Sequence, residues 1–149
     1  MLDQNELLTS VQSTLNDDLA LSEKLQRSGR GRVYIGPDFP TEPSPRFLSL
    51  AVLSNFQELD GHELEFTTLG VSVAVLSTFD NDEDLSALND ISQRVNTLLH
   101  NKPSAVTLTN DLISHISREG SLPPDTDKVG SEEFLVSQER FEILTTTKV

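Results

Sequence analysis

Ser72 lies in the stretch of this sequence that comes nearest to a catalytic motif. Gly70-Val71-Ser72-Val73-Ala74 differs by one residue from the G-x-S-x-G pattern of a hydrolase nucleophile elbow. That elbow requires a sharp turn from a strand into a helix, which exposes the serine. Here the apolar strand pattern continues through Val75 and Leu76. The sequence therefore predicts a strand residue at Ser72 rather than a nucleophile.

Two acidic stretches have part of the spacing of a calcium-binding loop. Asp80-Asn81-Asp82-Glu83-Asp84 is followed by Leu85 where the loop needs glycine and by Ile91 where it needs a bidentate glutamate. Asp125-Thr126-Asp127 has Val136 at that same glutamate position. Neither stretch completes a site. The first is better interpreted as a helix N-terminus, which carboxylates stabilise.

The histidines do not have metal-ligand spacing. His62, His100 and His115 lie on a predicted hairpin turn, a helix end and a strand, and the H-E-x-x-H motif is absent. We interpret His100 as a cation at a helix C-terminus and His115 as an outward-facing strand residue. Since no convergent acid–base set is visible either, we expect no enzymatic activity and no metal or other cofactor.

Composition narrows the class of protein. The 149 residues suffice for one domain, 1–149, with a modest 36% of hydrophobic residues to fill its core. No cysteine is present, which excludes disulfides, thiol catalysis and cysteine-based zinc sites. The sequence shows neither a secretory signal at its start nor an apolar run long enough to span a membrane. The net charge of −13 argues against binding to nucleic acid phosphates, although it suits a wall that DNA passes without sticking.

The basic residues gather at one place. Arg27, Arg30 and Arg32 surround Gly29 and Gly31. We interpret this cluster as a solvated turn between a helix and a strand. The alternative is a patch that forms salt bridges with an acidic neighbour or contacts passing DNA.

Two helical regions are predicted by their starts and their apolar spacing. Asp3 with Glu6 forms a capping-box-like start, and Asp18 is placed to cap a short second piece after a break at 16–18. A second capping-box-like start at Asp80 opens the strongest helical stripe of the chain. The stripe consists of Leu85, Leu88, Ile91, Val95, Leu98 and Leu99.

A long β-hairpin is predicted between these helices. Arg46–Leu59 and His62–Phe79 read as strands joined by Asp60-Gly61, a dipeptide suited to a type I′ turn. This register places Leu48, Leu50 and Val52 opposite Val73, Val71 and Leu69, so one face is apolar and offers a partner surface for the stripe of the second helix. The fourteen residues of the first strand would reach about 46 Å. A compact domain of this length measures about 38 Å across, so the arm 46–79 is expected to project.

The hairpin tip is the predicted contact surface. Leu59, Leu64 and Phe66 fall on one of its faces and Phe56 on the other, where an isolated monomer would leave them partly exposed. Phe39, in the proline-rich loop 37–45, serves the same purpose or folds onto its own core.

The remaining segments complete a mostly antiparallel sheet. Strands are predicted at 32–35, at 105–108 with 112–118, and at 133–146, whereas 120–130 reads as a loop. In the last strand, Phe134 and Val136 share one face while Phe141 and Ile143 share the other, which indicates a bulge or a strand buried on both sides. The order α-β-β-β-α-β-β gives an α+β domain, with two helices packed on one face of the sheet.

Several stretches together resemble the bacteriophage tail terminator family, also called tail completion, minor tail or head–tail joining proteins. The stretches are the divided N-terminal helix with Leu8 to Leu25, the step Gly31-Arg32-Val33-Tyr34-Ile35-Gly36 before Pro40 and Pro45-Arg46-Phe47-Leu48, the hairpin leading to Val73–Ser77 and Leu85…Leu99, and the closing strand pair after a Pro-Asp loop. The likeness covers nearly the whole chain.

The resemblance implies a structural virion protein. Such proteins form hexameric rings that cap the tail tube, stop its polymerisation and dock to the head connector or stopper, while DNA passes through the lumen without specific binding. The implied location is the tail or neck of a virion assembled in the host cytoplasm. Two other classes stay open: a different head–tail connector or neck protein, and an acidic DNA mimic that inhibits a nucleic-acid enzyme.

Overall fold

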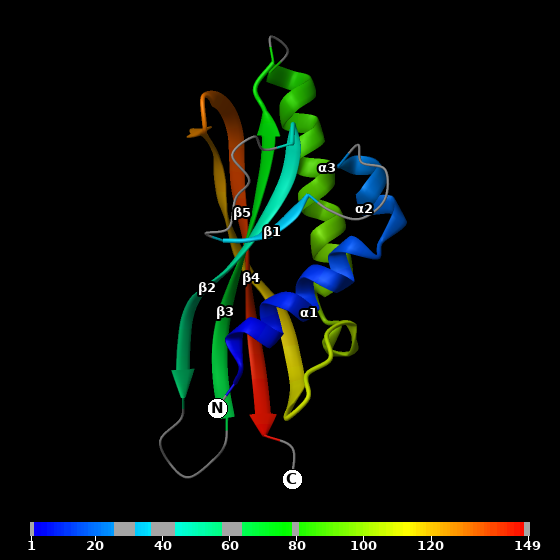
Figure 1. Ribbon diagram of the computed structural model, residues 1–149, viewed down its shortest axis with the longest axis vertical. Helices are drawn as coiled ribbons and strands as arrows, with labels where there is room; N and C mark the ends of the chain where they lie inside the picture. Colours follow the sequence, from blue (N-terminus) through cyan, green and yellow to red (C-terminus); the bar gives the residue numbers. More distant parts are fainter. Residues whose placement is uncertain (1, 26–31, 37–43, 58–63, 79–80, 148–149) are drawn as a thin grey trace.

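The computed structural model describes residues 2–25, 32–36, 44–57, 64–78 and 81–147, and shows three helices lying against one face of a sheet (Figure 1). The sheet has the strand order β1-β2-β3-β5-β4, in which β1 runs parallel to β2 and every other pair is antiparallel. This confirms the predicted α+β class. The elements in chain order are α1 (Gln4–Asn16), α2 (Leu19–Lys24), β1 (Val33–Ile35), β2 (Arg46–Gln57), β3 (Leu64–Leu76), α3 (Asn81–Leu99), the short 3₁₀ helix η1 (Pro103–Ala105), β4 (Asp111–Val129) and β5 (Glu132–Thr147).

The first two helices begin where the sequence predicts. The Asp3 carboxylate accepts the backbone N–H of Glu6 at 3.1 Å, and the Asp18 carboxylate accepts that of Leu21 at 2.9 Å. Each bond satisfies one of the N–H groups that a helix N-terminus leaves unpaired. The Asp18 carboxylate also accepts hydrogen bonds from Nε and Nη2 of Arg94, at 2.8 and 2.7 Å, and so links α2 to α3.

One hydrophobic core lies between the helices and the sheet. The stripe of α3 packs over the apolar face of the hairpin from Leu88 to Leu99, as predicted, and α1 and α2 extend the same cluster. The prediction is wrong at Leu85, which is 40% exposed and lies outside this cluster. Each fully buried leucine contributes about 1.5–3 kcal/mol to this packing. Core residues with no exposed surface include Leu7, Val11, Leu15, Leu21, Leu48, Leu50, Leu69, Val71, Val73, Leu88, Ile91, Val95, Phe141 and Ile143.

The register of the hairpin changes at Leu53. From Arg46↔Val75 to Val52↔Leu69 the strands pair as predicted, but the next pair is Ser54↔Thr68, so Leu53 is an extra residue in β2. A bulge of this kind moves every following side chain to the opposite face. The predicted register is therefore wrong beyond Val52.

A second, small core lies on the face of the sheet that carries no helix. Phe47 stacks edge-on against Tyr34 and Phe134, with ring centroids 5.7 and 5.3 Å apart, and Ala74 is buried beside them. The β3–β5 register shows no shift, and Phe141 lies in the main core. Of the two predicted alternatives for β5, the strand buried on both sides is correct.

Strand β4 is longer than predicted. The segment 120–130, expected to be a loop, is paired with β5 up to Val129↔Glu132. Three register shifts interrupt β4, and Pro123-Pro124 falls within the third, where no ladder hydrogen bond is required of a proline. The predicted strand at 105–108 is also wrong, because η1 occupies its beginning and Val106–Leu108 follow without strand pairing.

The hairpin 46–79 belongs to a wider sheet over its described length. β5 pairs with β3 from Leu76↔Phe134 down to Leu64↔Thr146, so β3 is flanked on both sides. The turn 58–63, with Leu59, lies outside the described residues, and a projecting tip stays a prediction for that segment.

Candidate interface at one end of the sheet

Apolar side chains from four strands meet on the helix-free face, at the lower end of the sheet in Figure 1. Phe56 lies opposite Phe66, which lies opposite Leu144, and in the neighbouring row Leu64 and Leu112 both flank Thr146. Directly opposite residues share a face of a sheet. We call Phe56, Leu64, Phe66, Leu112 and Leu144 the end patch.

The end patch is open to solvent. Phe56 is 64% exposed and Leu112 is 53% exposed, whereas the other three are half-buried. Exposed apolar side chains that cluster in this way are typical of protein contact surfaces. The patch thus has the character of an interface.

The structure brings together three of the seven residues that the sequence singled out. Phe56, Leu64 and Phe66 lie in the end patch. The prediction that Phe56 faces away from Phe66 is wrong: their ring centroids lie 6.4 Å apart, because the bulge at Leu53 turns Phe56 onto the same face. Leu59, Phe39 and Arg30 lie outside the described residues.

Arg32 has a structural role. Its guanidinium donates to the backbone carbonyl of Leu25, and its own carbonyl accepts the N–H of Leu48 at 2.8 Å. Its φ of 60° lies in the left-handed region. Arg32 therefore fastens the end of α2 to the start of the sheet, whereas Arg27 and Arg30 lie outside the described residues.

Leu112 and Leu144 were missed by the sequence reading. They lie on strands far from the hairpin in sequence, and only the order β3-β5-β4 places them beside Leu64 and Phe66. A signal for the bulge did exist in Gly70, since a glycine inside a strand indicates a close approach by another group. That group is the side chain of Leu53.

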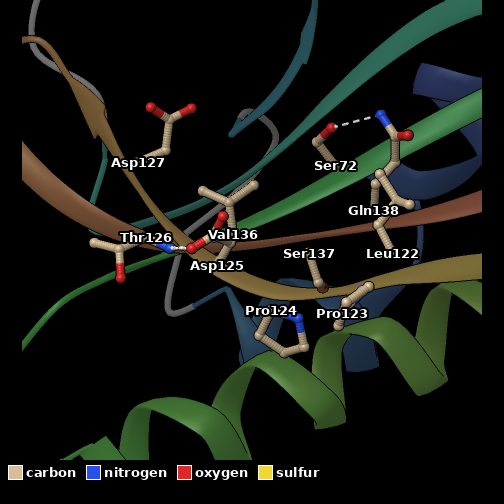
Figure 2. Close-up of a pocket in the computed structure, with 10 residues that line it drawn as sticks. All are labelled: Ser72, Leu122, Pro123, Pro124, Asp125, Thr126, Asp127, Val136, Ser137 and Gln138. Atoms are coloured by element: carbon tan, nitrogen blue, oxygen red, sulfur yellow. Dashed lines mark hydrogen bonds between the residues drawn. The ribbon is translucent and has the colours of Figure 1, made fainter.

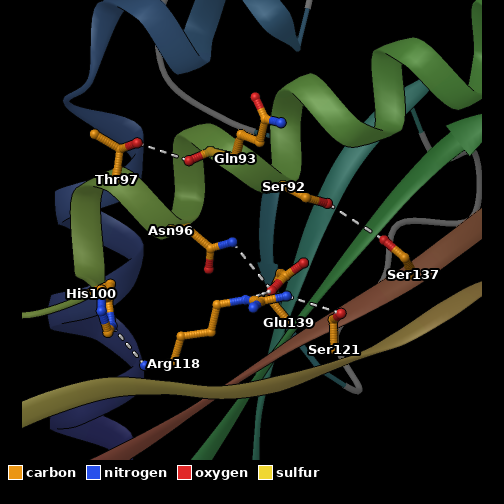
Figure 3. A network of polar contacts seen from close by, with 9 residues as sticks. All are labelled: Ser92, Gln93, Asn96, Thr97, His100, Arg118, Ser121, Ser137 and Glu139. Atoms are coloured by element: carbon orange, nitrogen blue, oxygen red, sulfur yellow. Dashed lines mark hydrogen bonds and ion pairs between the residues drawn. The ribbon is translucent and has the colours of Figure 1, made fainter.

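A buried polar network lies under α3 (Figure 3). Glu139, only 5% exposed, accepts a hydrogen bond from Nε of Arg118 at 2.8 Å and another from the amide of Asn96 at 3.3 Å. Arg118 also donates to Ser121 at 3.0 Å. The Arg118 guanidinium balances the charge of the buried Glu139 carboxylate. Since these hydrogen bonds join one residue each of α3, β4 and β5, the network holds the three elements together.

His100 follows the last residue of α3, at the helix end where the sequence placed it. Its Nδ1 accepts the backbone N–H of Arg118 at 2.9 Å and so links this helix end to β4 (Figure 3). His115 is exposed on β4, as predicted.

Three carboxylates gather near the start of α1. Asp111 and Glu65 are each 7% exposed, and Glu65 accepts the N–H of Leu2 at 2.7 Å and the Asn55 amide at 3.1 Å. Burial raises the pKa of Asp111, and the charges of Glu65 and Glu6 raise this pKa further. Within the part of the chain that the structure describes, no group of three or more His, Asp or Glu residues is arranged to hold a metal ion.

A shallow depression of about 670 Å³ lies beside the proline bulge of β4 (Figure 2). Its polar groups bond to one another: Gln138 donates to the Ser72 hydroxyl at 3.3 Å, and the Asp125 carboxylate accepts the N–H of Thr126 at 2.8 Å. Ser72 lies inside β3, as predicted, and its hydroxyl accepts a hydrogen bond from the Gln138 amide, which is not a base. The lining residues do not form the nucleophile–base pair that acyl transfer needs.

No described helix is both long and apolar enough to cross a membrane.

Comparison with known proteins identifies the fold. No protein family profile matches the chain, and no curated protein matches it. Among solved structures, the chain is similar to one from the virion of a native gene transfer agent particle, with a TM-score of 0.58 and 16% identity over 93% of this chain and 96% of that chain. A second solved structure matches with a TM-score of 0.54 and 12% identity over 100% of this chain and 98% of its own. The chain thus has, over nearly its full length, the fold of a protein from a gene transfer agent virion.

Proposed function

We propose that this chain is a structural protein of a phage-like virion, a tail terminator that caps the tail tube as a ring and joins it to the head connector. The observation that carries the proposal is the near-complete match of both chains, 93% and 96%, to a protein of a gene transfer agent virion. A match over whole chains concerns the entire domain rather than one shared motif. Fold likeness alone does not fix function, so the surface of this chain has to support the role as well.

The end patch supports a role in assembly. It combines exposed Phe56 and Leu112 with half-buried Leu64, Phe66 and Leu144 on one continuous face. Aromatic and leucine side chains arranged in this way bury well against a second protein surface. In the proposed ring, most simply a hexamer, the patch contacts the neighbouring copy or the tail tube protein.

The charge of the chain suits a conduit for DNA. At −13 per subunit, a ring of several copies has a strongly negative field. Such a field repels phosphates, so DNA passes through the lumen without specific binding. The proposal includes no catalysis, no cofactor and no contact with a membrane, and it places the protein in the tail or neck of a virion assembled in the host cytoplasm.

The experiment that tests the role replaces two residues of the end patch by acids. We expect the Leu64→Asp, Phe66→Asp double variant to lose ring formation and tail joining, as read from mass in solution and from electron micrographs of tail assemblies. A chain with Leu19→Asp, where the leucine is 80% exposed on α2, is the control and should assemble normally. Circular dichroism and thermal unfolding establish that each variant is folded. Unchanged rings and joined tails in the double variant would contradict the assigned interface.

A neck or stopper protein is the nearest alternative, since it would use the same ring logic at a different position. An image that places the ring between head and tail, rather than on the end of the tube, would favour it.

An acidic DNA mimic is the second alternative, and the net charge of −13 is the observation in its favour. Stoichiometric binding to a basic nucleic-acid enzyme, with no binding to tail tube protein, would favour this function over a role in the virion.

A further inference from the structure

The outer edge of β2 is only partly covered. β1 pairs with β2 at Leu48–Leu50, and the N–H of Gly36 closes this contact by donating to the carbonyl of Leu50 at 2.9 Å. From Ala51 to Gln57, β2 has no strand partner on this side among the described residues, and Figure 1 shows this half of β2 at the border of the sheet. A row of backbone donors and acceptors is therefore available there.

Apart from one bulge, the free edge lacks the features that usually protect a strand from pairing. Ala51–Gln57 reads A-V-L-S-N-F-Q, with no charged residue, proline or glycine, and its one irregularity is the bulge at Leu53. The opposite border of the sheet, β4, is interrupted by three register shifts and contains Pro123-Pro124. Bulges, prolines and charges are the means by which proteins prevent edge pairing. The sheet is thus protected at β4 and open at β2.

The direction of the free backbone groups follows from the register. The N–H of Leu48 donates outward to Arg32 at 2.8 Å, and hydrogen-bonding direction alternates along a strand. Leu48 opposes Val73, whereas beyond the bulge Asn55 opposes Thr67 and Gln57 opposes Glu65. These β3 residues are all odd-numbered and bond toward β5, so the backbone groups of Asn55 and Gln57 point outward from the sheet.

Phe56 adds a side-chain contact to this edge. Its ring is 64% exposed on the helix-free face and lies against Phe66 at the border of the end patch. A strand added beside β2 would place one of its own side chains next to Phe56. Backbone bonds that give affinity, with a side-chain contact that gives selectivity, are the pattern of β-strand addition.

We propose that the edge Ala51–Gln57 takes up an extended segment of another protein of the assembly, with an uncharged β-forming middle and lysine or arginine at its ends. Charge argues for this partner. The next six residues in sequence include Glu58, Asp60 and Glu63, and the chain as a whole has a net charge of −13. A second copy would double this charge, whereas a basic segment would offset it. The inference rests on the proposed function, because it names the surface by which a virion subunit holds a different virion protein.

The test uses the full chain and a synthetic probe. The probe is a nine-residue peptide of alternating valine and threonine with two lysines at each end, and the comparison peptide has glutamates in place of the lysines. We expect the lysine peptide to bind at least tenfold more tightly at 150 mM salt. In amide hydrogen exchange, the N–H groups of Asn55 and Gln57 should become protected, while those of Ser54 and Phe56, already bonded to β3, should change little.

Two variants and one control assign the site. Gln57→Pro removes an outward N–H at an edge position, and Phe56→Ser removes the aromatic contact, so each should weaken binding at least fivefold. Leu122→Ser, at a 46% exposed leucine on β4, should bind the lysine peptide as the unaltered chain does. Equal binding of both peptides, or protection confined to residues outside Ala51–Gln57, would overturn the inference.

Self-association is the competing outcome. Sedimentation velocity without peptide would overturn the proposal if it showed a dimer that Gln57→Pro abolishes, since a second copy would then be the occupant. Electron microscopy of rings separates this inference from the proposed function. Rings without peptide binding refute the edge site alone, and peptide binding without rings refutes the ring alone.

Discussion

The side chain of Leu53 lies directly over Gly70, so that a Cβ atom built on the glycine would be 2.9 Å from Cδ1 of the leucine. Leu53 is the extra residue of the β2 bulge, and Gly70 is the β3 residue opposite Ala51. The two positions fit each other: the glycine leaves the space that the bulged side chain fills. This pair thus determines on which face of the sheet the side chains of Ser54–Gln57, including Phe56, lie.

Gly70→Ala is expected to change the free energy of unfolding by less than about 1 kcal/mol. The three atoms nearest to the new methyl group belong to the side chains of Leu53 and Gln138, and Leu53 is 40% exposed and can rotate away. Gly70→Val, which needs more space, should be more destabilising, and Leu53→Ala should relieve that cost. Urea unfolding of the three variants and the Gly70→Val, Leu53→Ala combination measures the coupling. Strict additivity would contradict the contact.

Asp18 is expected to act both as a helix cap and as the partner of Arg94. Asp18→Asn keeps an N-cap oxygen but loses the charge of the pair, whereas Asp18→Ala loses both. The two variants should therefore differ by about 1 kcal/mol, the usual value of an N-cap. Thermal unfolding of both variants checks this, with Asp3→Ala at the N-cap of α1 as the comparison. Equal stability of the two Asp18 variants would show that the side-chain oxygen at this position does not stabilise α2 as a cap.

Asp111→Asn is expected to stabilise the protein at pH 7. Burial raises the pKa of Asp111 in the folded state, so the folded chain holds this proton more tightly than the unfolded chain does. The Asp111 carboxyl group contributes its full stabilisation when the pH is below its pKa in the unfolded chain, which is near 4. This stabilisation is lost as the pH rises through the pKa of Asp111 in the folded chain. The advantage of Asp111→Asn should accordingly disappear in acid.

Denaturant unfolding from pH 3 to pH 8 measures this dependence. Asp90→Asn, at an exposed position of α3, removes the same charge and serves as the control. A pH-independent difference between Asp111→Asn and the unaltered chain would show that the carboxylate is not the cause.

Arg118→Met is expected to destabilise the protein by about 1–3 kcal/mol, because the buried Glu139 carboxylate loses its charged partner. The lower end of that range is favoured, since the Arg118 side chain is 41% exposed and water can replace part of it. In combination with Glu139→Gln the loss should be smaller than the sum of the single effects. Arg140→Met, at an arginine that donates to the neutral Gln138 side chain, is the matched control. Additive effects of Arg118→Met and Glu139→Gln would contradict the pairing.

Local signals predicted the helices and the base of the hairpin correctly. Asp3 and Asp18 begin helices through side-chain bonds to residues three positions ahead, and the Leu48–Val52 alternation sets the register within one pair of strands. Helix caps and strand alternation depend on residues that are close in sequence, and so they can be recognised without the fold.

Non-local pairing explains what the sequence reading missed. Gly120 and Pro123-Pro124 are loop signals in isolation, yet β5 holds this segment as a strand and the bulge accommodates the prolines. The bulge at Leu53 also depends on β3, because its place is the space above Gly70. The end patch depends on the bulge and on the strand order. The bulge turns Phe56 onto the helix-free face, and the strand order places Leu112 and Leu144 beside the hairpin.

The position of β5 has a consequence for biogenesis. This strand lies between β3 and β4, although it is the last of the five to be synthesised. On the ribosome β3 therefore waits for its second neighbour, and loop closures of this length slow folding. The end patch gains Leu144, and thereby its continuity, in that same late step. Nascent chains consequently lack a complete end patch until β5 has been synthesised.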